Sequence, residues 1–266
     1  MILHLLIKSA CLSQQIWRHQ PIGFLKPFSF QRRNGILVKV SQVSDTILVS
    51  ALPFPFQCDL SHTALVVIDM QNDFCCKGGF GEALGNDVSP AEAIIPKVQS
   101  ILGGCRAIGM MIIHTREGHL PDLSDCPESK LTRSQVNGKG IGDEGPMGRI
   151  LIRGEYGHEI VKELKPLANE WVIDKPGKGA FYNTNLEQLL KSHGIESLLL
   201  TGVTTHVCVH TTLREANDRG YECLVLEDAT AAYDFADHEA AIRMVHQQGA
   251  IFGWVSDCNA LLEAIQ

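Results

Sequence analysis

The sequence predicts an α/β protein of three layers, α/β/α, in which helices cover both faces of a six-stranded, mainly parallel β-sheet of the Rossmann-like kind. Two observations predict this fold. From Thr63 onward, six short apolar runs alternate with stretches of helical character. The chain also has 266 residues, of which 45% are hydrophobic, and this is enough for one such domain to bury a large core.

The six predicted strands are runs that are apolar almost throughout. Such runs are typical of strands buried on both faces, whereas strands with one wet face alternate apolar and polar residues. The first run reads Thr-Ala-Leu-Val-Val-Ile-Asp over residues 63–69 and ends on a carboxylate. The other predicted strands cover residues 110–115, 171–174, 198–201, 223–226 and 251–255.

Helices are predicted between these strands, over residues 90–107, 184–192, 206–219, 237–248 and 259–265. Ser89 ahead of Pro90 is typical of a helix N-cap followed by proline at the first helical position. Gly194 and Gly220 mark two helix ends. The segment 120–147 is rich in proline, glycine and charge and is predicted to be a long loop, and loops of this length usually carry function.

The N-terminal region differs from the rest of the chain in charge. Residues 1–44 contain six lysines and arginines but no aspartate or glutamate, a composition that resembles a mitochondrial transit peptide. A disordered tail or a wrongly assigned start codon would explain it equally well. We therefore expect residues 1–45 to be an extension and residues 46–266 to form the folded domain. The predicted location is cytoplasmic, or mitochondrial if the extension is a transit peptide.

Composition argues against several classes of protein. The net charge of −7 disfavours nucleic acid as a partner, because a phosphate backbone binds a basic surface. No run of 18 apolar residues is present to span a membrane. The nine cysteines are irregularly spaced and include no C-x-x-C pair, which favours free thiols in a reducing compartment over disulfides or a zinc site. Neither a nucleic acid nor a membrane is therefore expected as a partner.

Three chemically active residues lie at predicted strand ends. Asp69 ends the first strand, Lys175 follows the third, and Cys208 lies in the first helical turn after the fourth. Ligands bind at the carboxyl ends of parallel strands, so an acid, a cation and a thiol at this edge suggest a nucleophile with its partners. The positive end of a helix would also lower the pKa of the Cys208 thiol.

Each of these residues also has an ordinary structural interpretation. Asp69 could cap or tether a loop, and Lys175 could be a solvated surface lysine. Cys208 could simply pack in the core with the apolar helical stripe that follows it, formed by Val209, Leu213 and Ala216.

Three motifs around these residues resemble one family. They are V-V-I-D-M-Q-N-D-F at Asp69, I-D-K-P-G-K-G at Lys175 and G-V-T-T-H-V-C-V at Cys208. They are similar to the cysteine hydrolases of the isochorismatase-like superfamily, and the similarity runs from about Ser50 to the C-terminus. The resemblance implies a catalytic triad of Asp69, Lys175 and Cys208, hydrolysis of an amide through a thioester, no metal or cofactor, and a homotetramer.

The resemblance also implies how an oxyanion would be held. The Val203–Thr204 peptide matches a position that is often cis in the family. The backbone N–H groups of Thr204 and Cys208 would then both point at one oxyanion.

Within the superfamily, the sequence is most similar to biuret amidohydrolases. The shared segments include H-T-R-E-G-H at residues 114–119, G-R-I-L-I-R-G-E at residues 148–155 and R-E-A-N-D-R-G-Y-E-C at residues 214–223. Gln248 falls where that group holds the substrate's amide, although a polar residue is also common at a helix end. The resemblance implies hydrolysis of biuret to allophanate and ammonia.

Several alternatives remain open. Ureidoacrylate amidohydrolases share the triad and a carbamoyl substrate, and the segment 252–257, F-G-W-V-S-D, resembles them equally. A metal-dependent, nicotinamidase-like protein would use His114 and His119, but Glu117 stands where that group has aspartate. The glycines of residues 78–81 lack the spacing of a nucleotide-binding loop. A catalytically silent member acting as an interaction module would more simply have lost a triad residue.

Overall fold

The computed structural model describes residues 30–33, 36–39 and 46–266. The chain divides into two units, residues 1–43 and 44–266. In the first, β1 (Phe30–Arg33) pairs antiparallel with β2 (Ile36–Lys39). The predictions made for the N-terminal extension concern residues that largely lie outside the described ranges. No helix among the described residues is long and apolar enough to cross a membrane.

The second unit is built on a six-stranded sheet in the order β12-β11-β10-β5-β6-β9, and every neighbouring pair in it is parallel. This confirms the predicted fold class. The strands are β5 (Thr63–Ile68), β6 (Met111–Glu117), β9 (Trp171–Lys175), β10 (Ser197–Val203), β11 (Glu222–Ala231) and β12 (Trp254–Ser256).

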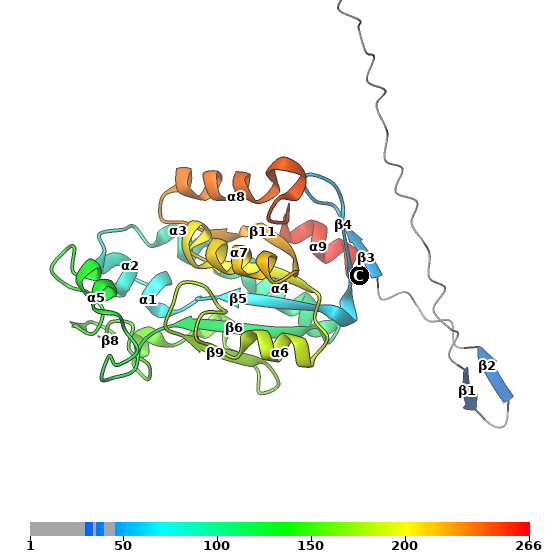
Figure 1. The fold of residues 1–266 in the computed structure, drawn as a ribbon, viewed down its shortest axis with the longest axis horizontal. Coiled ribbons are helices and arrows are strands. Elements are labelled where there is room, and N and C mark those ends of the chain that lie inside the picture. The colour runs from blue at the N-terminus through cyan, green and yellow to red at the C-terminus, as the bar shows by residue number, and fades with distance from the viewer. Residues whose placement is uncertain (1–29, 34–35, 40–45) are drawn as a thin grey trace, which may run out of the picture. The chain divides into compact units, whose positions relative to one another are not determined.

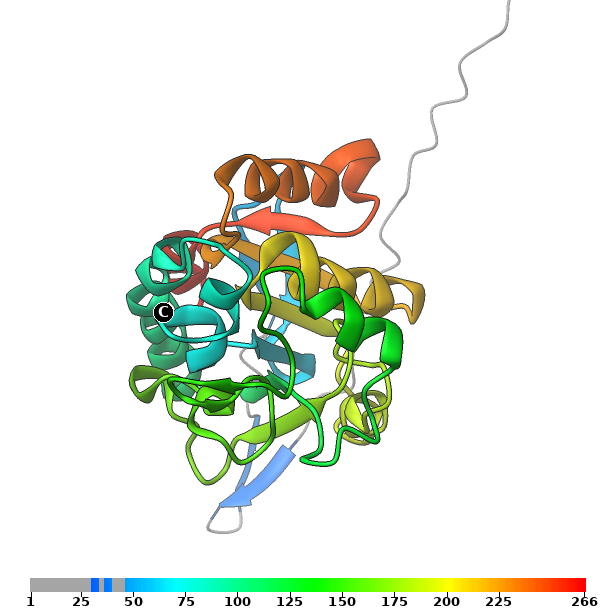
Figure 2. The same ribbon diagram turned by 90° about the vertical axis from the view of Figure 1, so that its left-hand side faces the viewer.

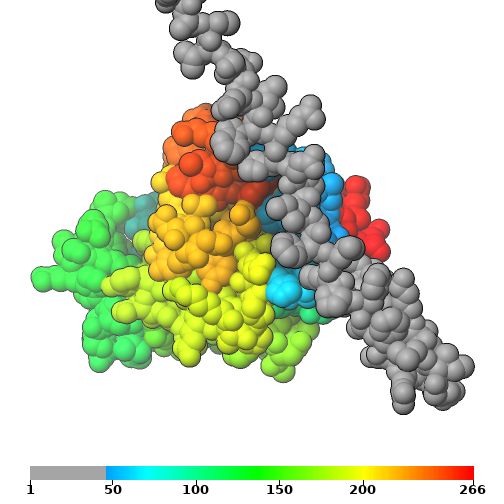
Figure 3. Space-filling view, turned by 45° about the vertical axis from the view of Figure 1, so that its right-hand side comes forward, coloured from blue at the N-terminus to red at the C-terminus, as the bar shows by residue number. Residues whose placement is uncertain are grey.

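Helices cover both faces of this sheet (Figures 1 and 2). One face carries α3 (Ser89–Ala93), α4 (Ile95–Ala107) and α9 (Cys258–Ala264), and the other carries α6 (Leu186–Ser192), α7 (His210–Asp218) and α8 (Phe235–Ala250). In the space-filling view, α8, α7 and α6 lie one below another on the outer surface (Figure 3).

The central strand β5 shows why its sequence is apolar throughout. Leu65 and Val67 pack in the core cluster that includes α4 and α9, whereas Ala64, Val66 and Ile68 pack in the cluster that includes α6, α7 and α8. All five side chains are at most 1% exposed. Successive side chains of a strand point to opposite faces, so a strand covered on both sides has no polar position.

Shorter elements complete the unit and lie mainly in its connections. They are β3 (Thr46–Val49), β4 (Phe56–Asp59), α1 (Asn72–Cys75), α2 (Phe80–Ala83), α5 (Glu128–Ser134), β7 (Glu144–Gly145) and β8 (Gly148–Arg149). Three 3-10 turns cover Leu60–His62, Tyr156–His158 and Lys162–Leu164, and a π-helical turn covers Thr205–Val209.

The predicted helix over residues 90–107 is divided into α3 and α4. Pro96 lies in the first turn of α4, where its missing N–H costs nothing, whereas it would break one continuous helix. Ser89 is the first residue of α3 and gives no side-chain cap; instead Asp87 accepts hydrogen bonds from the Ser89 N–H at 3.0 Å and hydroxyl at 2.7 Å.

Two other boundaries differ from prediction. The last strand begins at Trp254 and not at residue 251, because α8 extends to Ala250. Near that end, Gln248 and Gly249 have left-handed φ angles of 53° and 77°, which kink the helix. The predicted long loop contains the short helix α5, whose seven residues carry too weak a pattern to be recognised in a charged segment.

The strand order determines where a ligand would bind. From β5 the chain proceeds outward on one side through β6 to β9, then crosses to the other side of β5 and proceeds through β10 and β11 to β12. Where the winding direction reverses, the connections leave the sheet in opposite directions and open a crevice at the carboxyl strand ends. This crevice lies beside the end of β5.

Candidate active site

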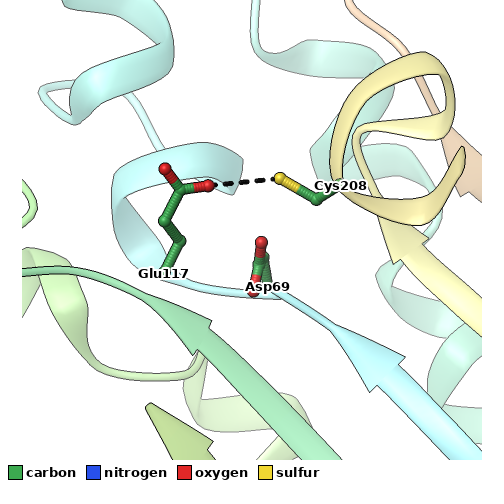
Figure 4. Close-up of side chains that lie close together, drawn as sticks. All are labelled: Asp69, Glu117 and Cys208. Carbon is green, nitrogen blue, oxygen red and sulfur yellow. Dashed lines mark hydrogen bonds between the residues drawn. The ribbon is translucent and has the colours of Figure 1, made fainter. Parts of the chain in front are cut away.

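Four ionisable side chains meet at the carboxyl ends of the neighbouring strands β10, β5, β6 and β9. Asp69 follows β5, Glu117 ends β6, Lys175 ends β9, and Cys208 lies in the π-helical turn after β10. Cys208 is 3% exposed and the other three are 0% exposed. Asp69, Glu117 and Cys208 point toward a common centre (Figure 4). The structure therefore brings together the three predicted residues and adds Glu117.

The backbone at the end of β5 orients the Asp69 side chain toward this centre. Asp69 has a left-handed φ of 50°, which aspartate tolerates better than most residues, and its N–H donates to the Thr115 carbonyl at 3.1 Å. On the adjoining strand, Gly202 has a φ of 107°, and a Cβ there would lie 2.0 Å from the Ile68 carbonyl oxygen. Only glycine allows β10 to approach β5 this closely.

Asp69 and Lys175 form a buried ion pair, with 2.7 Å between Lys175 Nζ and Asp69 Oδ2. The ammonium also donates to the carbonyls of Gly177 and Lys178, both at 2.9 Å. Burial lowers the pKa of Lys175, but attraction to Asp69 and the other acids outweighs it, so the pKa is raised and the lysine stays charged.

Burial has the opposite effect on Asp69. It raises the pKa of this carboxyl, Lys175 opposes the rise, and the negative charge of Glu117 adds to it. The Thr115 hydroxyl donates to Oδ1 at 2.7 Å and fixes the orientation of the carboxylate. The net direction is upward, and a carboxylate with a raised pKa is a better proton acceptor.

Glu117 is held in place at its side chain and at its backbone. Oε1 lies 2.7 Å from Lys130 Nζ and 3.0 Å from Lys178 Nζ. The Gln71 amide accepts from the N–H of Glu117 at 2.7 Å and donates to its carbonyl at 3.0 Å. Burial raises the pKa of Glu117, but Lys175, Lys178 and Lys130 together outweigh it, so the pKa is lowered and the group remains ionised.

Cys208 donates its thiol hydrogen to Glu117, with 3.3 Å between Sγ and Oε2. Burial raises the pKa of the thiol, Lys175 and Lys178 lower it, and Asp69 and Glu117 raise it, so the net pKa is well above its ordinary value. The expectation that a helix N-terminus lowers this pKa is therefore wrong. Burial beside two carboxylates outweighs the helix end, and Cys208 requires a base to become a thiolate.

A cavity of about 290 Å³ opens above Cys208, large enough for a small substrate. Its apolar wall is formed by Phe74, Phe80, Leu84, Val207 and Tyr233, and its polar lining by Asn86, Glu117, Lys178, Thr204, His206, Asp234 and Asp237. The Val203–Thr204 peptide bond is cis. A second cavity of about 330 Å³, lined by Arg116 and Tyr156 among others, includes no member of the predicted triad.

Gln248 is not brought to this cavity. It is exposed near the kinked end of α8 and does not line the space above Cys208. The prediction that it holds the substrate's amide is therefore not supported by the single chain, because the left-handed residues of the kink end the regular helix before this position.

The donor atoms of Asp69, Glu117 and Cys208 lie within 4.8 Å of one another, and among the described residues they form the one group close enough to share a metal ion. Lys175 already pairs with Asp69, and Lys130 and Lys178 with Glu117. Three ammonium groups around the same centre repel a cation, so this donor set does not suit a metal.

His114 and His119 do not converge on the site. His114 Nε2 lies 3.0 Å from Glu170 Oε2, and His119 Nδ1 lies 3.2 Å from Asp125 Oδ1. Each histidine has its own carboxylate partner, and neither belongs to a group of donor atoms close enough to share a metal ion among the residues that the structure describes.

Sequence reasoning missed the residues around Glu117. In the sequence, Glu117 stands out only as a departure from a metal-binding pattern, although its place near a strand end is the same signal that identifies Asp69. Lys178 lies within the motif of Lys175 and could have been included. Lys130 gave no signal, because it reaches the site from α5 in a segment predicted to be a loop.

Comparisons with known proteins identify the family of this chain. The model of the isochorismatase domain family matches residues 63–257. Ureidoacrylate amidohydrolase RutB of Yersinia enterocolitica is 34% identical over 229 residues, covering 83% of this chain and 98% of that protein. RutB of Methylorubrum extorquens is 34% identical over 223 residues, covering 82% of this chain and 89% of that protein.

Solved structures give the same result. A cysteine hydrolase from Pseudomonas syringae pv. phaseolicola has a TM-score of 0.67 and 26% identity, covering 78% of this chain and 94% of that one. An isochorismatase family protein from Desulfovibrio vulgaris has a TM-score of 0.64 and 29% identity, covering 76% of this chain and 97% of that one. The chain belongs to the isochorismatase family of hydrolases, which confirms the family predicted from the sequence and the prediction of a hydrolase.

Proposed function

We propose that this protein is a cysteine-dependent amidohydrolase that cleaves a carbamoyl amide through a thioester intermediate. One observation carries the proposal: the thiol of Cys208 lines a small cavity and shares a buried centre with the Asp69–Lys175 ion pair. The names of the relatives, which are amidohydrolases, support the same reaction class.

The first half of the reaction forms the acyl-enzyme. Asp69 accepts the thiol proton, and Sγ of Cys208 attacks the carbonyl carbon, whose π electrons move onto the oxygen. The predicted donors to this oxyanion are the backbone N–H groups of Thr204 and Cys208. The oxyanion then collapses, the C–N bond breaks, and the leaving nitrogen takes the proton from Asp69 and departs as an amine.

The second half of the reaction releases the acyl group. Asp69, again a carboxylate, accepts a proton from water as the water oxygen attacks the thioester carbon. The C–S bond breaks, the sulfur takes the proton back from Asp69, and the resting thiol is restored. Lys175 keeps its charge throughout, because its pKa is raised by the acids around it.

Two carbamoyl substrates are candidates. The comparisons favour ureidoacrylate, the substrate for which the relatives reported above are named. Biuret, with allophanate and ammonia as products, is supported by the motifs that this chain shares with biuret amidohydrolases. The homotetramer, the cytoplasmic location and the boundary of the folded domain remain predictions.

The test is to incubate the full-length protein with ureidoacrylate, biuret, triuret and nicotinamide, and to follow substrate loss and ammonia release. Cys208→Ala should reduce turnover of the preferred substrate at least about a thousandfold, as loss of a nucleophile does elsewhere. The matched control is Cys223→Ala, which removes another buried thiol, on β11, outside the cavity. It should retain activity.

The outcomes separate the alternatives. Preference for ureidoacrylate or for biuret assigns the substrate, and both keep the mechanism. Equal activity of Cys208→Ala and the unmodified protein would reject the cysteine mechanism. A folded protein that turns over none of the four compounds would reject a carbamoyl amide as substrate and favour the silent interaction module.

A further inference from the structure

The site contains two carboxylates where the proposed reaction uses one. Asp69 Oδ2 pairs with Lys175 at 2.7 Å, whereas Glu117 Oε2 lies 3.3 Å from Cys208 Sγ. Figure 4 shows both acids directed at the thiol from different strands. The mechanism assigns the proton to Asp69 and leaves the contact between Glu117 and the thiol without a function.

Glu117 is a poor base, because neighbouring ammonium groups stabilise its ionised form and so oppose its protonation. Its Oε1 is held by Lys130 and Lys178, and Lys175 Nζ lies 3.6 Å from its Oε2. The Glu117 carboxylate is 0% exposed, and so is Lys175, whereas the side chains of Lys130 and Lys178 are 14% and 44% exposed, so water screens Lys175 least. A carboxylate in this environment stays ionised, and an ionised carboxylate can only accept a hydrogen bond. The thiol must therefore be the donor.

A fixed negative charge next to sulfur favours the neutral thiol over the thiolate. The charged and titratable groups that face Cys208 are Asp69, Glu117, Lys175, Lys178 and Tyr233. Of these, Glu117 is the one joined to Sγ by a hydrogen bond. Asp69 and Glu117 both oppose deprotonation, and Glu117 is the one that also orients the S–H bond.

We propose that Glu117 is a positioning residue that keeps the Cys208 thiol protonated and oriented in the resting enzyme. The proton is then released only when Asp69 accepts it during attack on a bound substrate. Lys130, from α5, and Lys178, from the segment after β9, hold Glu117 in the ionised form that this role requires. This inference deepens the proposed function and rests on Cys208 being its nucleophile.

The test measures the thiol directly and requires no substrate. The full-length protein and Glu117→Gln are alkylated with iodoacetamide between pH 6 and pH 10, and labelling of the Cys208 peptide is followed by mass spectrometry. Cys208→Ala gives the background from the other cysteines. Below the thiol pKa, the thiolate fraction rises tenfold for each unit by which that pKa falls, and the alkylation rate rises by a smaller factor because a less basic thiolate is a weaker nucleophile.

Replacing Glu117 by glutamine keeps the shape of the side chain and removes its charge. The expected result is alkylation of Cys208 at least about tenfold faster at pH 7, with the pH profile displaced toward lower pH. The matched control is Asp125→Asn, which removes an acid that pairs with His119 and Arg153 in the same region. It should leave the Cys208 profile unchanged.

A profile in Glu117→Gln that equals that of the unmodified protein, or lies at higher pH, would overturn the proposal. If Glu117→Gln does not fold, as judged by circular dichroism, the double variant Glu117→Gln/Lys178→Met removes one charge of each sign. It is then compared with Lys178→Met alone, and faster alkylation in the double variant is required. Because labelling needs no turnover, failure here is distinct from failure of the proposed substrate class.

Discussion

Lys175→Met tests whether the buried ion pair with Asp69 holds the site together. Methionine has nearly the length of the lysine stem, so the change mainly removes the charge and leaves no large cavity. Asp69 then remains at 0% exposure, having lost an ammonium at 2.7 Å. Removing one partner of a buried pair costs about 3–5 kcal/mol of unfolding free energy. For a domain of this size, that lowers the melting temperature by about 6–20 °C.

The second variant, Lys175→Met/Asp69→Asn, isolates the cause. Asparagine tolerates the left-handed φ of 50° at this position and carries no charge. If an unpaired carboxylate is what destabilises the single variant, the double variant should recover about 1–2 kcal/mol of it. Urea unfolding of the two variants and the unmodified protein measures this difference.

The pH dependence gives a further check on the same cause. Burial raises the pKa of Asp69 in the folded state, and loss of Lys175 raises it further. An acid whose pKa is raised in the folded state lowers the free energy of unfolding least below its unfolded-state pKa of about 4. It lowers that free energy most once the pH exceeds its folded-state pKa. The deficit of Lys175→Met should therefore be larger at pH 8 than at pH 5, and the double variant should lack this trend. A double variant no more stable than the single one would refute the reasoning.

Three further predictions concern residues other than the four ionisable groups of the site. Burial raises the pKa of Glu170, but hydrogen bonds from Arg106 and His114 outweigh it and lower the pKa to about 2. Glu170→Gln should therefore cost about 1–3 kcal/mol at pH 7, and this loss should fade as the pH falls from about 4 to 2; a pH-independent loss in urea unfolding would contradict it. Gly202→Ala should prevent folding, because its Cβ would lie 2.0 Å from a backbone oxygen of β5. Gly103→Ala, in α4 with no atom within 4 Å of the new Cβ, should instead raise the unfolding free energy by about 0.5–1 kcal/mol; equal thermal melts for the two alanine variants would contradict the packing argument.

The parts of the fold that can be predicted from sequence are those whose signal is local. β5 is recognisable because burial on both faces leaves it without a polar position. Asp69 and Lys175 are recognisable because a charged residue directly after a buried strand falls at the edge where parallel strands end. Helix boundaries are less accurate at Pro96 and at Gln248, where proline and left-handed residues change the backbone within an otherwise helical pattern.

The features of the site that cannot be predicted from sequence depend on several residues that are brought together only by folding. The thiol pKa of Cys208 reflects burial together with two acids and two lysines from three different segments, and a helix position alone gives the wrong sign. Lys130 helps to hold Glu117, although it lies 13 residues further along the chain in a charged segment without periodicity. Neither effect has a signature that a single sequence displays.

The charge balance of the site explains why burial does not prevent the reaction. Burial raises the pKa of both Asp69 and Cys208, which would block a step that created a new charge. Transfer of the proton from sulfur to Asp69 creates none, because one negative charge disappears from the carboxylate as another appears on sulfur. What governs the step is the difference between the two pKa values.

Lys175 faces both groups, and its charge stabilises the anion before and after the transfer. Glu117 raises both pKa values, and of these two groups it is the thiol to which it is hydrogen-bonded, so it stabilises the protonated thiol at rest. In the proposed reaction the proton leaves sulfur only when a substrate is bound, which restricts a reactive thiolate to the moment when a carbonyl carbon is there to receive it.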